Sequence, residues 1–122
     1  MTVTGPEDPV GWTIRPAAEE DLAAIWTAGV ADWGAVQADR YIDTLFAVFD
    51  LLAAFPQMAR ERAELRPGVR IHPSGAHLVI YRQIGPSEDA QAGAQPGGPQ
   101  IEVIRLLHAH QDLTAYLAAE GP

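Results

Sequence analysis

The chain has 122 residues, a formal net charge of −8 and no cysteine. A single domain of this length can bury somewhat over ~60% of the surface that its unfolded form exposes. The absence of cysteine excludes a disulfide framework, a thiolate metal site and a cysteine nucleophile. Every basic residue is arginine, and so acidic a chain repels nucleic acid on average, so we expect no direct nucleic-acid binding.

The ends of the chain carry no structural pattern. Residues 1–11 are rich in Pro, Gly and Thr and predict a disordered leader, followed by a single domain over 12–119 and a tail over 120–122. The N-terminus lacks the basic-then-apolar pattern of a secretion signal, and no run approaches the ~20 apolar residues of a membrane span. We therefore expect a cytoplasmic protein without membrane contact.

The first half of the domain predicts one strand and two helices. Trp12 to Arg15 alternates apolar and polar residues, as a strand does, and Pro16 suits the first position of a helix. Gly34 is a stop signal for that helix. The apolar residues at helical spacing before it are Leu22, Ile25, Trp26, Val30 and Trp33.

A second helix is predicted from about Ala35 to Phe55, where Pro56 ends it. Since Gly34 is nearly the whole connection, the two helices must form an αα-hairpin. The charged residues 57–67 predict a solvated connector. One face of the second helix carries Tyr41, Leu45, Val48, Phe49 and Leu52.

The second half predicts three strands. Val69 to Arg82, VRIHPSGAHLVIYR, indicates two strands joined by a turn at residues 73–75. A hairpin alone is marginally stable, and Ile101–His108 supplies a third strand. The Gly- and Pro-rich residues 85–100 between them predict a flexible loop. Asp112 can cap a short final helix that carries Leu113, Tyr116 and Leu117.

These elements predict an α+β, two-layer domain. An N-terminal strand precedes the αα-hairpin, which must lie on one face of an antiparallel sheet because its apolar stripe needs a cover. Three C-terminal strands complete this sheet, and the short helix ends the domain.

The polar residues suggest no metal site and no cofactor. Four histidines fall at strand ends, but no carboxylate stands at ligand spacing beside them and no His-x-x-x-His pair exists. We interpret His72, His77, His108 and His110 as ordinary strand-end residues. No serine has the context of a nucleophile.

Two arginines share strand faces with apolar residues. Alternation groups Arg82 with Leu78, Ile80 and Ile84, and Arg105 with Ile101, Val103 and Leu107. They either reach water or pair with an acid, or they form a small cationic feature for a carboxylate-bearing partner, which Arg70 could join.

The aromatic stripe of Trp26, Trp33, Tyr41 and Phe49 is expected to be mostly core. However, Ile42 and Phe46 widen the stripe beyond what a small sheet can cover, which is typical of a partner-binding groove.

Five segments, in this order, resemble the ParE toxins of the RelE/ParE superfamily: PAAEEDLAAIW, Ala31–Ile42, FPQMARER, GVRIHPSGAHLVIYR and VIRLLHAHQDLTAYL. The match spans about Thr13 to Leu117. The resemblance implies the toxin half of a bacterial type II toxin–antitoxin pair, in a hetero-oligomer with a ParD-like antitoxin. ParE-like toxins typically poison DNA gyrase and block replication, whereas RelE-like relatives cut mRNA on the ribosome.

The resemblance favours the ParE branch and a protein that is not an enzyme. RelE-like catalytic positions correspond here to Leu78, His110 and Tyr116, and of these Tyr116 alone matches well. Phosphodiester cleavage needs groups that position the 2′-hydroxyl and stabilise the developing phosphate charge. A leucine in place of an arginine, in a chain without lysine, supplies these groups poorly. The alternatives are a RelE-like ribosome-dependent endoribonuclease and a non-toxic, antitoxin-binding co-repressor.

The same resemblance yields candidate residues for two partners and none for catalysis. The target-facing candidates are Arg70, His77, Arg82, Arg105 and His108. The antitoxin-binding candidates are Trp26, Trp33, Tyr41, Ile42, Phe46 and Phe49. We expect recognition of the antitoxin to rest on the apolar groove and a few arginine contacts. Residues 85–100 are longer and more polar than this family's hairpin predicts, which indicates an insertion.

Overall fold

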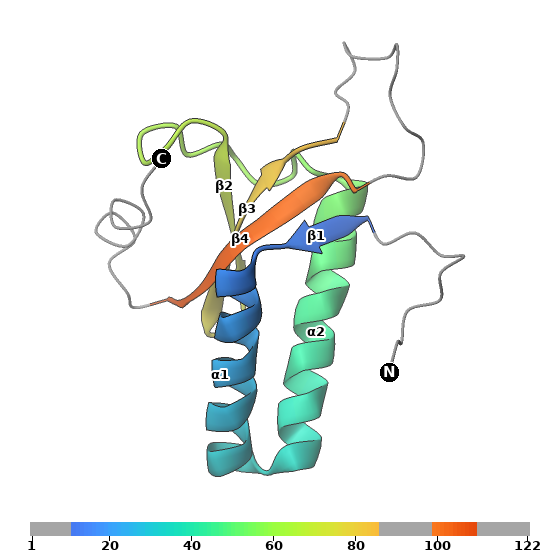
Figure 1. Cartoon of the computed structure of the whole chain (residues 1–122), viewed down its shortest axis with the longest axis vertical. Coiled ribbons are helices and arrows are strands. Elements are labelled where there is room, and N and C mark those ends of the chain that lie inside the picture. The colour runs from blue at the N-terminus through green and yellow to red at the C-terminus, as the bar shows by residue number, and fades with distance from the viewer. Residues whose placement is uncertain (1–10, 86–98, 110–122) are drawn as a thin grey trace.

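A computed structural model describes residues 11–85 and 99–109 (Figure 1). The predicted leader up to residue 10, the loop over 86–98 and the short final helix, with His110 and Tyr116, lie outside the described residues. The elements are β1 (Trp12–Ile14), α1 (Pro16–Trp33), α2 (Ala35–Ala54), β2 (Val69–Ser74), β3 (His77–Gln83) and β4 (Ile101–His108).

The two helices form the predicted αα-hairpin. Pro16 stands in the first turn of α1, where its missing N–H costs no hydrogen bond. Gly34 separates α1 from α2 and has a φ of 95°, a conformation that glycine adopts without steric cost. The helices run side by side on one face of the sheet, and their connected end projects beyond it (Figure 1).

The sheet has the strand order β1-β4-β3-β2. β2, β3 and β4 are antiparallel neighbours, as predicted. β1 instead pairs with β4 in parallel, so the expectation of a wholly antiparallel sheet was wrong for this strand. The reason is the connection: β1 reaches β4 without a hairpin turn, so no turn geometry imposes an antiparallel direction.

The β2–β3 turn is shorter than predicted. β2 continues through Pro73 to Ser74, which pairs with His77, so the turn consists of Gly75 and Ala76. Pro73 is tolerated because β2 is an edge strand, where a missing N–H breaks no ladder. Gly75 has a φ of 61°, and a Cβ there would lie 2.8 Å from the Tyr41 hydroxyl oxygen. The turn therefore needs glycine for both its φ and its space.

Both faces of the sheet carry buried apolar residues. The face under the helices packs Leu45, Phe49 and Leu52 of α2 against Val79, Tyr81, Ile101, Val103 and Leu106. The opposite face, called the outer face below, carries Val69, Ile80, Ile104 and Leu107.

A register shift at Ile80/Tyr81 breaks the alternation in β4. Arg105 pairs with Ile80 and Val103 with Tyr81, which leaves Ile104 between them without a partner in β3. The extra residue turns Leu107 to the outer face. Our grouping of Arg105 and Leu107 with Ile101 and Val103 was therefore wrong, because Arg105 pairs with Ile80 of the outer face.

The connector over residues 57–67 is more than solvated chain. Ala59 is buried in the core under the helices, and Leu65 packs against the outer-face cluster. Glu61 forms an isolated antiparallel bridge with Arg70, which partly covers the edge of β2. Ala59 and Leu65 were not predicted to be buried, because charged residues of alternating sign surround them in the sequence.

Candidate functional site

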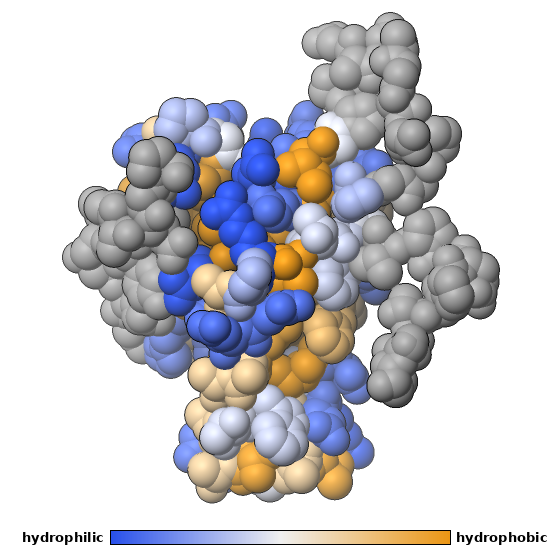
Figure 2. Space-filling model, in the orientation of Figure 1, coloured by the Kyte–Doolittle hydropathy of each residue, from blue (hydrophilic) through white to orange (hydrophobic). Residues whose placement is uncertain are grey.

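The projecting end of the helical hairpin exposes large apolar side chains. Trp26 is 40% and Trp33 55% exposed, and α1 buries only Ala18 and Gly29 among its residues. Figure 2 shows apolar residues gathered over this part of the hairpin. Such a surface costs solvation free energy unless a partner covers it.

Trp33 and Tyr41 form one wall of a cavity at the base of this surface. Their ring centroids lie 5.9 Å apart in an edge-to-face contact. Together with Gln37 of α2 and Ala76 of the β2–β3 turn, they line a hollow of about 460 Å³. The turn and the hairpin end therefore enclose an apolar recess.

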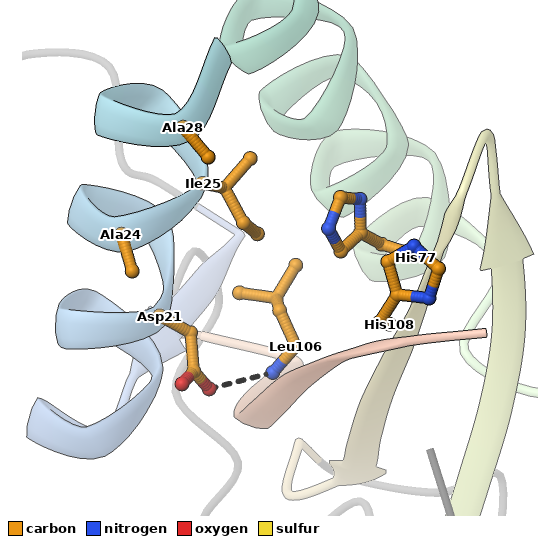
Figure 3. A pocket seen from close by; sticks show the side chains of 7 residues that line it. All are labelled: Asp21, Ala24, Ile25, Ala28, His77, Leu106 and His108. Carbon is orange, nitrogen blue, oxygen red and sulfur yellow. Dashed lines mark hydrogen bonds between the residues drawn. The ribbon is translucent and has the colours of Figure 1, made fainter. Parts of the chain in front are cut away.

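A second hollow, of about 220 Å³, lies between α1 and the adjoining ends of β3 and β4 (Figure 3). Its α1 wall is made of small and aliphatic residues, and His77 and His108 stand opposite. The lining residues are Asp21, Ala24, Ile25, Ala28, His77, Leu106 and His108.

We call the two hollows together the groove. A hydrogen bond links a residue of one hollow to a residue of the other. The Tyr41 hydroxyl lies 2.7 Å from Nδ1 of His77. The same hydroxyl accepts the Ala76 N–H at 3.2 Å and lies 3.2 Å from the Ser74 carbonyl oxygen. Tyr41 lines the first hollow and His77 the second, so their hydrogen bond joins the walls of the two hollows.

Burial shifts the pKa of both linked groups. Desolvation raises the pKa of Tyr41, with a smaller opposing effect from the Ala76 N–H. Desolvation, and then the neighbouring His108, lower the pKa of His77, while Asp21 opposes the shift. Both groups are therefore held neutral at pH 7.

The other four antitoxin-binding candidates separate by environment. Trp26 is exposed and donates its indole N–H to Asp39 at 2.7 Å. Ile42 is half-buried against the core. Phe46 is 37% exposed and stacks on Trp12 at 5.7 Å. Phe49 is fully buried, so it reaches a partner only through its neighbours.

Arg105 is bound within the structure rather than offered to solvent. Its guanidinium contacts Asp21 of α1 through two hydrogen bonds, of 2.7 Å and 3.0 Å. Asp21 also accepts the N–H of Leu106 at 2.9 Å (Figure 3). Only 12% of the Arg105 side chain and 16% of the Asp21 side chain are exposed. This pair fastens the first turns of α1 to β4.

Arg82 has a different environment. It is 48% exposed and donates to Glu102, its cross-strand neighbour, at 2.7 Å. Arg15 contacts the same carboxylate at 3.3 Å. Burial raises the pKa of Glu102, but the hydrogen bonds from Arg15 and Arg82 outweigh it and leave the pKa lowered. Two arginines thus share one carboxylate, which gives this spot a positive charge.

Arg70 and His108 complete the target-facing candidates. Arg70 donates to the Ala59 carbonyl oxygen at 2.6 Å, which ties β2 to the connector. The His108 ring meets the His77 ring edge-on, with centroids 5.5 Å apart. The five candidates are therefore not one cluster, because the histidines lie in the groove and Arg82 lies apart from them.

Sequence reasoning missed four residues here. Asp21 was not among the predicted site residues, and Arg15 was placed only at the end of the first predicted strand. Ala24 and Ala28 line the groove; their spacing of four residues places them on one side of α1, which is the one signal that could have indicated them.

No group of three or more His, Cys, Asp or Glu side chains that could hold a metal ion occurs within residues 11–85 and 99–109. In that same part of the chain, neither helix is both long enough and apolar enough to cross a membrane.

The fold describes the general class of protein, and the comparison with known families gives the family. Two helices on a four-stranded mixed sheet, with an apolar groove beside them, make a small two-layer α+β domain. The family model described as ParE toxin of type II toxin-antitoxin system, parDE, matches residues 13–113. The chain belongs to this family, and it is a ParE toxin of a type II toxin–antitoxin system.

Named relatives agree with this assignment. The chain is 32% identical over 102 residues to Toxin ParE1 of Mycobacterium tuberculosis, which covers 84% of this chain and 92% of the relative. It is 34% identical over 100 residues to Toxin ParE1 of Caulobacter vibrioides, which covers 82% and 90%.

A solved structure shares the fold. A chain of the chromosomal ParDE TA system from P. aeruginosa aligns with a TM-score of 0.59 at 16% identity. The alignment covers 83% of this chain and 97% of that chain. At this identity the likeness concerns the fold alone.

Proposed function

We propose that this toxin inhibits DNA gyrase, blocks replication and is neutralised by a ParD-like antitoxin that binds in the groove. The antitoxin part rests on the apolar groove, whose exposed Trp33 and half-buried Tyr41 are the kind of aromatic anchors that dominate protein interfaces. Membership in the ParE family supports the gyrase part.

The toxin acts by binding and performs no chemistry. Leu78 stands where RelE-like nucleases use an arginine, and it lies half-buried in β3 with no charge to offer a phosphate. The groove itself holds the half-buried His77, whose pKa is lowered, and the Asp21–Arg105 pair, whose charges offset each other. A target is therefore held by contact area and by the exposed Arg15–Glu102–Arg82 group.

A gyrase assay tests the target. Purified toxin is added to gyrase supercoiling and DNA-cleavage reactions, with and without ATP, and linearised plasmid is followed on a gel. Inhibition with accumulated cleaved DNA is the expected result. No effect at micromolar toxin, from a preparation that arrests growth in cells, would contradict gyrase as the target, and cleavage of ribosome-bound mRNA would then establish the RelE-like alternative.

The antitoxin part has a separate test. Affinity for the product of the adjacent gene is measured between low and moderate salt. Because the groove is apolar, we expect the dissociation constant to change little as screening increases. A collapse of affinity with salt would show that charges, rather than the groove, hold the antitoxin. A harmless but folded product, expressed without the antitoxin, would favour the co-repressor alternative.

A further inference from the structure

Three polar side chains stand in contact among the apolar walls of the groove. His77 is hydrogen-bonded to Tyr41, and its ring meets the ring of His108. His77 is half-buried, and its Nδ1 lies 2.7 Å from the Tyr41 hydroxyl. Across the hollow the two imidazoles face Ile25 and Leu106 (Figure 3). A titratable group thus stands where a partner side chain has to pack.

The hydrogen bonds of Tyr41 accommodate both protonation states of His77. With neutral His77 in the Nε2–H tautomer, the tyrosine O–H donates to Nδ1. With charged His77, Nδ1–H donates to the tyrosine oxygen, and the tyrosine O–H turns to the Ser74 carbonyl oxygen 3.2 Å away. Ala76 donates to the tyrosine oxygen in both states. The hydrogen bonds therefore favour neither protonation state of His77. Burial and the neighbouring charges decide which state is populated.

Polar and charged groups face His77 from three elements. α2 contributes the hydroxyl of Tyr41 and β4 the ring of His108, which disfavours a second positive charge. α1 contributes Asp21, whose carboxylate is bound to Arg105 of β4. The rest of the wall is aliphatic, from Ala24, Ile25, Ala28 and Leu106. Burial and His108 together outweigh Asp21 and favour neutral His77.

We propose that the antitoxin seats an aliphatic side chain over His77, against Ala24, Ala28 and Leu106, and that protonation of His77 therefore opposes antitoxin binding. This inference rests on the proposed function. An aliphatic group excludes water from the imidazole, so the charged form loses more in the complex than in the free toxin. Acid then releases the toxin from its antitoxin.

The sign and size of the effect follow from linkage. Binding lowers the pKa of His77 further below its ordinary value of 6.5, so the complex binds fewer protons than its separated parts. The affinity for the antitoxin is full at pH values above the pKa of His77 in the free toxin, and it falls as the pH drops through that pKa. One proton gives at most about a tenfold loss of affinity per pH unit.

The test measures the dissociation constant of the toxin with the adjacent-gene product at pH 7.5 and at pH 5.5. The wild type is expected to bind more weakly at pH 5.5, and His77→Gln, which keeps an acceptor for Tyr41, to lose most of that dependence. His72→Gln is the matched control, because His72 lies on β2 and does not line the groove. A His77→Gln variant as pH-dependent as the wild type would overturn the proposal.

A second readout needs no variant to fold. The imidazole resonances of His77 are titrated in free and bound toxin, and its pKa is expected to fall on binding. A rise would overturn the proposal and indicate an acidic partner side chain instead. Equal affinity at both pH values would overturn the proton link alone, whereas no binding at either pH would overturn the proposed antitoxin site as well.

Discussion

Arg105 and Arg82 look alike in the sequence and differ in the structure. Each follows apolar residues in a strand, and each pairs with one carboxylate. Arg105 is 12% exposed and joins β4 to α1, whereas Arg82 is 48% exposed and joins two neighbouring strands. The contrast shows that a strand arginine supports the fold where a helix packs beside it, and remains available to a partner where only a neighbouring strand meets it.

Arg105→Ala should give the largest effect. The substitution leaves Asp21 buried without its partner, which costs about 3–5 kcal/mol of the free energy of unfolding. Urea denaturation measures the change. A loss below about 1 kcal/mol would mean that water screens this pair, and the contrast between the two arginines would disappear. Arg105→Ala combined with Asp21→Leu should recover part of the loss, because no unpaired charge remains.

Trp33→Ser should rank second, and it tests the groove rather than the fold. Trp33 is 55% exposed, so we expect little change in stability but a loss of antitoxin affinity of about 30-fold, the size of a moderate hot spot. Phe55→Ser is the matched control, because Phe55 is 61% exposed at the far end of α2. Equal losses from both variants, in a calorimetric titration, would contradict the assignment of the groove.

Arg82→Ala should have the smallest effect on stability. Its ion pair is half exposed, so its loss should cost less than about 1 kcal/mol. The pKa of Glu102 should rise, because one of the hydrogen bonds that lower it is gone. The pair contributes above the ordinary pKa of a glutamate and is lost as the pH falls through the lowered value. A carboxyl NMR titration measures the shift, and an unchanged pKa would mean that Arg15 alone holds the carboxylate.

The sequence predicted the elements well because local signals define them. Pro16 and Gly34 fix the ends of α1, and the apolar-rich run Ile101–His108 coincides with β4 to its last residue. The parallel direction of β1 and the shift at Ile104 depend on contacts between distant segments, which no local pattern contains. For the same reason Leu107 was assigned to the wrong face.

The site could be predicted only in part. The width of the aromatic stripe indicated surplus apolar surface, and Trp33 is indeed exposed while Phe49 is core. Periodicity could not separate these two, because burial depends on where the hairpin extends past the sheet. Asp21 was missed because its partners, Arg105 and the Leu106 N–H, are more than eighty residues away.

The most direct test of this contrast between the groove and the surface around Arg82 is hydrogen exchange of the toxin with and without the adjacent-gene product. The account predicts slower exchange in the groove elements, at residues 21–42 and at the β2–β3 turn, and unchanged exchange around Arg82 and Glu102. Protection of the strands around Arg82 and Glu102, with the groove unaffected, would contradict it.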